Sequence, residues 1–216
     1  CFVHLSDGSI LGRHFVMLLL IMQLLLGFRR LRDLDYYKDD PLVKRILGLN
    51  RLPDVATISR ALSQADLMSI SRARELCRAL ALERLKKLQP ARLTLDFDGT
   101  VIWTGGRAEG SAVGFNTKSK GARSCYPLFC TVAQTGQVLD FHHRHRNVHD
   151  SNGARGFILE CLASIRRQMP WVVLEARLDS AFFSDEIIRE LAQAGVKFTV
   201  SVPFEHCCRS CKNVFF

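Results

Sequence analysis

The spacing of apolar and polar positions changes near residue 90 and divides the chain into a helical part and a strand-rich part. Before residue 90, apolar residues recur every three to four positions, which is typical of helices with one buried face. The predicted helices cover residues 14–26, 40–48, 58–63 and 66–88. In the last of these helices, the predicted buried face consists of Ile70, Ala73, Cys77, Leu80 and Leu88.

After residue 90, short apolar runs bounded by turn residues predict strands. We expect strands at 92–98, 126–133, 137–143, 171–177 and 196–202, and helices that end at Gln168 and near Gly195. The order β-β-β-α-β-α-β predicts an antiparallel meander followed by parallel strands with right-handed crossovers. The predicted fold is therefore α/β, with an N-terminal helical region at 1–90 and a mixed sheet with flanking helices at 91–216.

Two short helices joined by a turn lie within the helical region, with Lys44, Arg45, Arg51 and Arg60 nearby. This arrangement is typical of a helix-turn-helix that binds DNA, with Arg60 as a candidate contact. A plain helical bundle with a solvated basic face fits the same pattern. The apolar run 15–28 is shorter than the roughly 20 residues that a membrane span needs. It predicts a buried core helix, and we expect a cytoplasmic protein with no membrane partner.

Charge favours a polyanionic partner. The chain has 216 residues, and 30 Lys and Arg against 21 Asp and Glu give a net charge of +9. Such a balance is typical of proteins that bind nucleic acid, although an ordinary basic protein has it too. Further candidate contacts to phosphate lie in a Gly-rich segment and after the strand at 137–143: Lys118, Lys120, Arg123, Arg144 and Arg146.

Carboxylates inside an apolar run carry the candidate chemistry. Asp96 and Asp98 lie in the run 93–102 and point to the same face of the predicted strand. Two buried like charges need a compensating cation such as Mg²⁺, unless the strand end simply meets water. Asp179 follows the strand at 171–177 and can meet Asp98 or Asp96 if the two strands are neighbours. Carboxylates from two strands can hold Mg²⁺ for phosphodiester chemistry, whereas Asp179 alone fits a turn residue.

Several motifs together resemble the DDE transposases of bacterial insertion sequences, which have a ribonuclease-H-like catalytic core. They are LDFDGTV at 95–101, GFN at 114–116, YPL at 126–128, TGQVL at 135–139, RNVH at 146–149 and RLDSAFFS at 177–184. The resemblance implies that Asp98 and Asp179 are catalytic acids that bind Mg²⁺ or Mn²⁺, with Asp96 as a supporting neighbour and further metal ligand.

The same resemblance implies a function and partners. We expect metal-dependent phosphodiester cleavage and strand transfer on DNA, at insertion-sequence ends and at the target. A homodimer is expected for the full-length protein, associated with the nucleoid. The third acid of such enzymes is a Glu on a later helix, and no matching motif precedes Phe216. This predicts a C-terminally truncated chain that is inactive alone.

Two other interpretations stay open. The sequence DFDGT also resembles the first motif of haloacid-dehalogenase-like phosphatases, in which Asp96 would be the nucleophile and Asp98 the general acid. That family needs a helix soon after the motif, whereas residues 99–150 have the pattern of turns and strands. The other alternative is a DNA-binding remnant that has lost catalysis, for which steeply salt-dependent binding without cleavage is expected.

Overall fold

The computed structural model of the chain describes residues 13–104, 111–113, 121–143 and 153–202. The chain forms two compact units, residues 1–70 and 71–216. The division therefore falls at residue 70, inside a long helix, whereas the pattern changes from helices to strands near residue 90. Residues 71–88 of that helix share the compact unit of the sheet.

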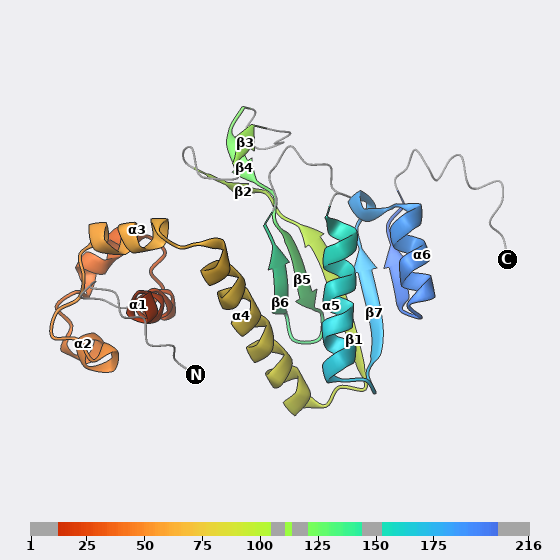
Figure 1. The fold of residues 1–216 in the computed structure, drawn as a ribbon, viewed down its shortest axis with the longest axis horizontal. Helices are drawn as coiled ribbons and strands as arrows, with labels where there is room; N and C mark the ends of the chain where they lie inside the picture. Colours follow the sequence, from red (N-terminus) through yellow and green to blue (C-terminus); the bar gives the residue numbers. More distant parts are fainter. Residues whose placement is uncertain (1–12, 105–110, 114–120, 144–152, 203–216) are drawn as a thin grey trace. The chain divides into compact units, whose positions relative to one another are not determined.

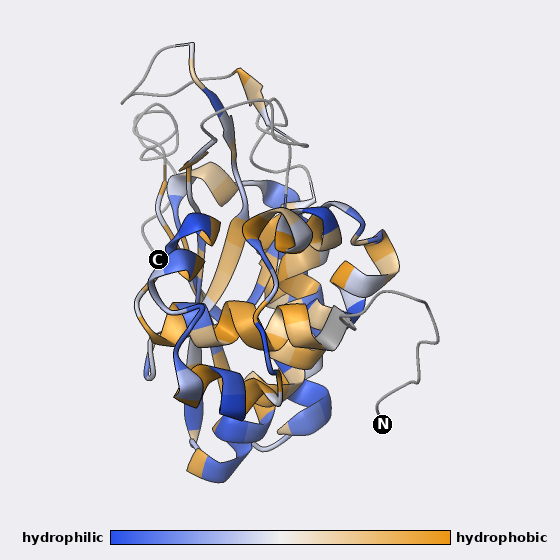
Figure 2. Cartoon of the chain, turned by 90° about the vertical axis from the view of Figure 1, so that its left-hand side faces the viewer, coloured by the Kyte–Doolittle hydropathy of each residue, from blue (hydrophilic) through white to orange (hydrophobic). Residues whose placement is uncertain are grey.

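The first unit is helical. Its elements are α1 (Arg13–Leu25), the 3-10 helix η1 (Leu31–Tyr36), α2 (Pro41–Leu47) and α3 (Val55–Ser63). Helix α1 is apolar along its length (Figure 2). Its residues Val16 and Leu19 are buried with Leu34 and Ile58. The prediction of a buried core helix is confirmed for this face only, because the opposite face is exposed and carries Met17, Leu18, Ile21, Leu24 and Leu25. No helix in the described ranges is long and apolar enough to cross a membrane.

Helix α3 begins earlier than the sequence suggested. The sequence predicts a helix over 58–63, but α3 begins at Val55, and the Asp54 carboxylate caps it by accepting a hydrogen bond of 2.7 Å from the backbone N–H of Thr57. This bond and the nearby charges of Arg60 and Arg51 lower the pKa of Asp54. Arg60 is exposed in the last turn of α3, and its guanidinium donates to the Thr57 hydroxyl at 3.3 Å.

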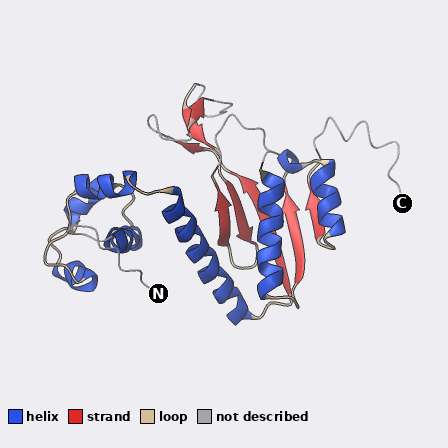
Figure 3. Ribbon diagram, viewed as in Figure 1, coloured by secondary structure: helices blue, strands red, loops and turns tan. Residues whose placement is uncertain are grey.

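The second unit is built on a five-stranded mixed sheet (Figures 1 and 3). Its strands are β1 (Arg92–Gly99), β5 (Leu128–Val132), β6 (Gln137–His142), β7 (Val173–Leu178) and β8 (Lys197–Val200). The spatial order is β6-β5-β1-β7-β8. Strands β6, β5 and β1 pair antiparallel, and β1, β7 and β8 pair parallel. The predicted fold class and the order β-β-β-α-β-α-β are confirmed.

Three helices share one core with this sheet: α4 (Leu67–Leu88), α5 (Ala154–Gln168) and α6 (Asp185–Gln193). A second 3-10 helix, η2 (Ser180–Phe182), links β7 to α6. Ser184 caps α6 by accepting a hydrogen bond from the N–H of Ile187. The short strands β2 (Ile102–Trp103), β3 (Ala112–Val113) and β4 (Arg123–Cys125) form a separate sheet in the order β2-β4-β3.

The predicted buried face of α4 is wrong. Ile70, Leu80 and Leu88 are more than half exposed, and Cys77 is exposed as well. The face turned to the core instead carries Ala81, Leu82 and Leu85. One turn and two turns before them, Arg78 and Arg74 reach the buried carboxylate of Asp140 on β6. The buried face of α4 therefore includes charged residues, which apolar spacing cannot reveal.

Candidate metal site at the ends of strands β1 and β7

Strand β1 separates its apolar and acidic side chains onto two faces of the sheet. Leu93, Leu95 and Phe97 are buried in the core, where the Phe97 ring meets Phe157 of α5 edge-on. Since side chains alternate along a strand, Asp96 and Asp98 point to the opposite face. The two acids therefore share a face, as the sequence predicted, but that face is open enough to leave Asp98 exposed.

The neighbouring strand β7 brings Asp179 to the same edge of the sheet. Strand β7 runs parallel to β1, and the last matched pair in their register is Phe97 with Leu178. The next residues along the two strands are Asp98 and Asp179, both exposed. Figure 1 shows that β1 and β7 lie side by side and end at the same edge of the sheet. The register thus places Asp98 and Asp179 next to each other, after the ends of the shared ladder.

Local structure fixes the backbone on both sides of this edge. Asp179 accepts a hydrogen bond of 2.9 Å from the N–H of Ala181 and thereby caps η2. The turn function expected of Asp179 as an alternative is therefore present. On the other strand, a Cβ added to Gly99 would lie 2.6 Å from the ring of Tyr126. The residue after Asp98 therefore has to be very small while that ring stays in place.

Asp96 has a partner of its own. Arg177 is its register partner on β7 and binds it through two bonds, Nε to Oδ1 at 2.5 Å and Nη2 to Oδ2 at 2.7 Å. The hydrogen bonds and the charge of Asp96 raise the pKa of Arg177. Both oxygens of Asp96 therefore face a guanidinium in the structure. Its role as a metal ligand stays a prediction, and no feature of the sequence indicated that Arg177 would bind it.

The predicted DNA contacts are only partly within the described ranges. Lys118, Lys120, Arg144 and Arg146 lie outside them. Arg123 is exposed on β4, and its guanidinium holds the hydroxyl and the carbonyl oxygen of Ser111 at 3.2 and 2.6 Å. Arg60 belongs to the other compact unit. DNA binding by any of these side chains stays a prediction.

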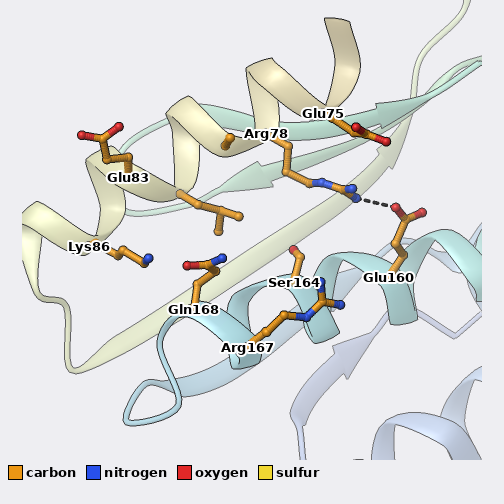
Figure 4. A pocket seen from close by; sticks show the side chains of 10 residues that line it. Glu75, Arg78, Glu83, Lys86, Glu160, Ser164, Arg167 and Gln168 are labelled. Atoms are coloured by element: carbon orange, nitrogen blue, oxygen red, sulfur yellow. Dashed lines mark hydrogen bonds and ion pairs between the residues drawn. The ribbon is translucent and has the colours of Figure 1, made fainter. Parts of the chain in front are cut away.

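A groove of about 450 Å³ lies between α4 and α5 in the same unit. Figure 4 shows side chains of both signs along it, among them Lys86, Arg167 and the pair of Arg78 with Glu160. Both helices pack in the core with Leu95 and Phe97, on the face of β1 opposite to Asp98. The groove is therefore separate from the acidic edge. Among the described residues, no group of three or more His, Cys, Asp or Glu side chains is arranged to hold a metal.

Comparison with known protein families shows the family to which the chain belongs. The sequence profile described as "Transposase DDE domain group 1" matches residues 12–206, which is nearly the whole chain. The chain belongs to this transposase family. No curated protein matches it.

Solved transposase structures are similar to the chain at low sequence identity. The Mos1 transposase paired-end complex with left transposon end is 10% identical, with a TM-score of 0.38, over 92% of this chain and 61% of that one. The piggyBac transposase synaptic complex with hairpin DNA is 13% identical, with a TM-score of 0.43, over 90% and 44%. The Drosophila P element transposase strand transfer complex is 14% identical, with a TM-score of 0.35, over 89% and 46%. The chain thus spans less than two thirds of each of these proteins.

The family and the topology settle the phosphatase alternative. A haloacid-dehalogenase-like arrangement needs a helix soon after the acidic motif and a parallel sheet around it. Here the strand after β1 in the main sheet is β5, which pairs with β1 antiparallel. The nucleophile that this alternative requires, Asp96, is also held at both oxygens by Arg177. The phosphatase interpretation is therefore wrong.

Proposed function

We propose that this chain has the DNA-binding and metal-binding functions of a transposase, with Asp98 and Asp179 holding a divalent metal ion of the kind used for phosphodiester cleavage and strand transfer, and that the chain alone does not cleave DNA. The observation that carries the proposal is the parallel register of β1 and β7, which puts these two acids side by side in a chain of the DDE transposase family. Neither residue belongs to the packed core, so both carboxylates can serve chemistry at an exposed edge.

The donor set fits Mg²⁺ or Mn²⁺. Both are hard cations that prefer carboxylate oxygens and keep several waters, so two carboxylates are a sufficient protein contribution to one ion. The Asp98 carboxylate forms no ion pair with any described residue, and its backbone is fixed by the β1–β5 ladder. When bound, such an ion activates a water or hydroxyl and stabilises the leaving oxygen of a phosphodiester.

The chain's own residues orient the two acids. Asp98 is held by pairing with Phe129 on β5, and Asp179 by its cap of η2. Asp98 lies near the end of β1 and Asp179 follows β7, and both strands pack in the same core. A site that must place a phosphate relative to an ion is best built on such packed elements.

The excess of positive charge supports DNA as the partner, with a net charge of +9 over the whole chain. Phosphate contacts by Lys and Arg give affinity without sequence information and fall steeply with salt. Insertion-sequence ends and target DNA are the proposed substrates, and a homodimer is the proposed assembly.

The test uses the 216-residue chain, a labelled DNA duplex and Mn²⁺. We expect DNA binding that Mn²⁺ strengthens and whose affinity falls steeply between 50 and about 200 mM salt. We expect no cleavage, because the resemblance calls for three acids and the described residues bring only two together. Cleavage that is lost in Asp98→Asn and Asp179→Asn would confirm the site and refute the expected inactivity. Binding without any metal dependence would favour the DNA-binding remnant.

A further inference from the structure

The open face of the sheet carries two rows of charged residues across β1 and β7. The first row is the register pair Asp96 and Arg177, and the second is Asp98 with Asp179. Residues two apart along a strand are separated by roughly 7 Å, so the rows are close neighbours. Without Arg177, three carboxylates would share this small area, and each could take part in binding a cation.

In the structure, Arg177 occupies the carboxylate of Asp96, so that Asp96 is not available to a cation. The guanidinium approaches Asp96 side-on, and each carboxylate oxygen receives one N–H at 2.5 or 2.7 Å. Such a planar, two-bond contact is the arrangement in which Arg binds a carboxylate most specifically. The side chains of Arg177 and Asp96 are 56% and 34% exposed, so the pair is accessible to water and contributes little to stability. Since the pair lies beside Asp98 and Asp179, the proposed metal ligands, its role is better sought in metal binding than in stability.

We propose that Arg177 is a positioning residue that keeps Asp96 out of the metal site and thereby confines the ion to Asp98 and Asp179. This inference rests on the proposed metal site and adds the residue that decides which carboxylates become ligands. Removing the guanidinium releases both oxygens of Asp96. Asp96 would then be able to hold the ion as a third carboxylate, in place of a water molecule.

The chain contains a matched control. Arg92 also lies on β1 and forms an ion pair of 3.0 Å with Glu175 of β7. Its side chain is 56% exposed, the same as that of Arg177. It lies six residues from Asp98, which is roughly 20 Å along the strand. Arg92→Gln therefore also removes one positive charge and an ion pair between β1 and β7, but it does so far from Asp98 and Asp179.

The experiment binds Eu³⁺, a luminescent oxygen-seeking probe, to the 216-residue chain and measures lifetimes in H₂O and D₂O. The difference between them gives the number of water molecules on the bound ion. The signal that disappears in Asp98→Asn is assigned to the site. We expect Arg177→Gln to lower the water number by at least one and to tighten binding about tenfold, through the loss of one nearby positive charge and the gain of a ligand. We expect Arg92→Gln and Asp96→Asn to leave the water number unchanged.

The double variant Asp96→Asn with Arg177→Gln completes the cycle and should return the water number to that of the original chain. An unchanged water number in Arg177→Gln, or a raised one in Asp96→Asn, would overturn the role of Arg177 while leaving the metal site intact. If Arg177→Gln does not fold, a raised water number in Asp96→Asn still refutes the proposal, because it would show that Asp96 is a ligand despite Arg177. If the original chain gives no signal that depends on Asp98, the proposed metal site itself is refuted.

Discussion

The buried carboxylate of Asp140 should be the most sensitive single position in the sheet-bearing unit. Its side chain is 1% exposed and receives four hydrogen bonds. Arg74 donates two of them, at 2.7 and 2.8 Å, and Arg78 donates a third at 3.2 Å. The fourth comes from the backbone N–H of Phe141 at 2.8 Å. We predict that Asp140→Asn strongly destabilises this unit.

The magnitude follows from what the substitution leaves behind. Asn keeps one acceptor oxygen but turns an amide N–H₂ toward a guanidinium, so donor faces donor and the negative charge is gone. Breaking a buried ion pair by removing one partner costs about 3–5 kcal/mol. Arg74 and Arg78 keep 26% and 20% of their side chains exposed, and both also contact Glu160. The cost should therefore lie at the lower end, about 3 kcal/mol.

Urea unfolding measures this loss. Both tryptophans, Trp103 and Trp171, lie in residues 71–216, so tryptophan fluorescence follows the sheet-bearing unit alone. With a slope of about 2 kcal/mol per molar urea, the midpoint should fall by about 1.5 M. The control Glu83→Gln breaks the exposed pair of Glu83 with Lys87 and should shift the free energy of unfolding by less than about 0.5 kcal/mol. A loss below about 1 kcal/mol in Asp140→Asn would refute the reasoning.

Three further predictions concern single positions. Burial would raise the pKa of Glu160, but the hydrogen bond from Arg78 and the charges of Arg74 and Arg78 outweigh it and lower the pKa. The stability that Glu160 contributes is therefore present above its ordinary pKa of 4.5 and is lost as the pH falls through the lowered pKa. The melting temperatures of the original chain and of Glu160→Gln should therefore converge below pH 4.5. Gly99→Ala should lower the melting temperature by displacing the Tyr126 ring, and Tyr126→Ala in the same chain should reduce that loss; equal losses would contradict the contact. Ser184→Ala should cost about 1 kcal/mol in urea unfolding through loss of the α6 cap, and no change would contradict it.

The order of the elements in the sheet was predictable because local signals determine it. The tight turn between β5 and β6 makes these strands antiparallel neighbours. Helices alternate with β7 and β8, which favours parallel pairing. Few arrangements of the strands satisfy both conditions. The shared face of Asp96 and Asp98 follows in the same way from strand alternation. The position of Asp179 required one assumption, that β7 is the neighbour of β1, and the parallel register confirms it.

What the sequence could not provide are contacts between charged residues far apart in the chain. The pair of Asp96 and Arg177 joins residues 81 positions apart, and the pair of Arg74 and Asp140 joins residues 66 apart. The spacing of apolar and polar residues does not reveal either ion pair, because it indicates only whether a face is apolar or polar on average. Arg74 and Arg78 therefore made the inner face of α4 look polar, and Arg177 was counted only as part of a motif.

Binding of Mn²⁺ to the 216-residue chain tests the central claim most directly. Calorimetric titration would compare the original chain with Asp98→Asn, Asp179→Asn and the variant that carries both substitutions, with Asp185→Asn as an exposed control in the first turn of α6. The account predicts that either single substitution at the site abolishes the binding event, that the double substitution has no further effect, and that the control binds as before. Binding that survives in either single variant would contradict a site shared by Asp98 and Asp179.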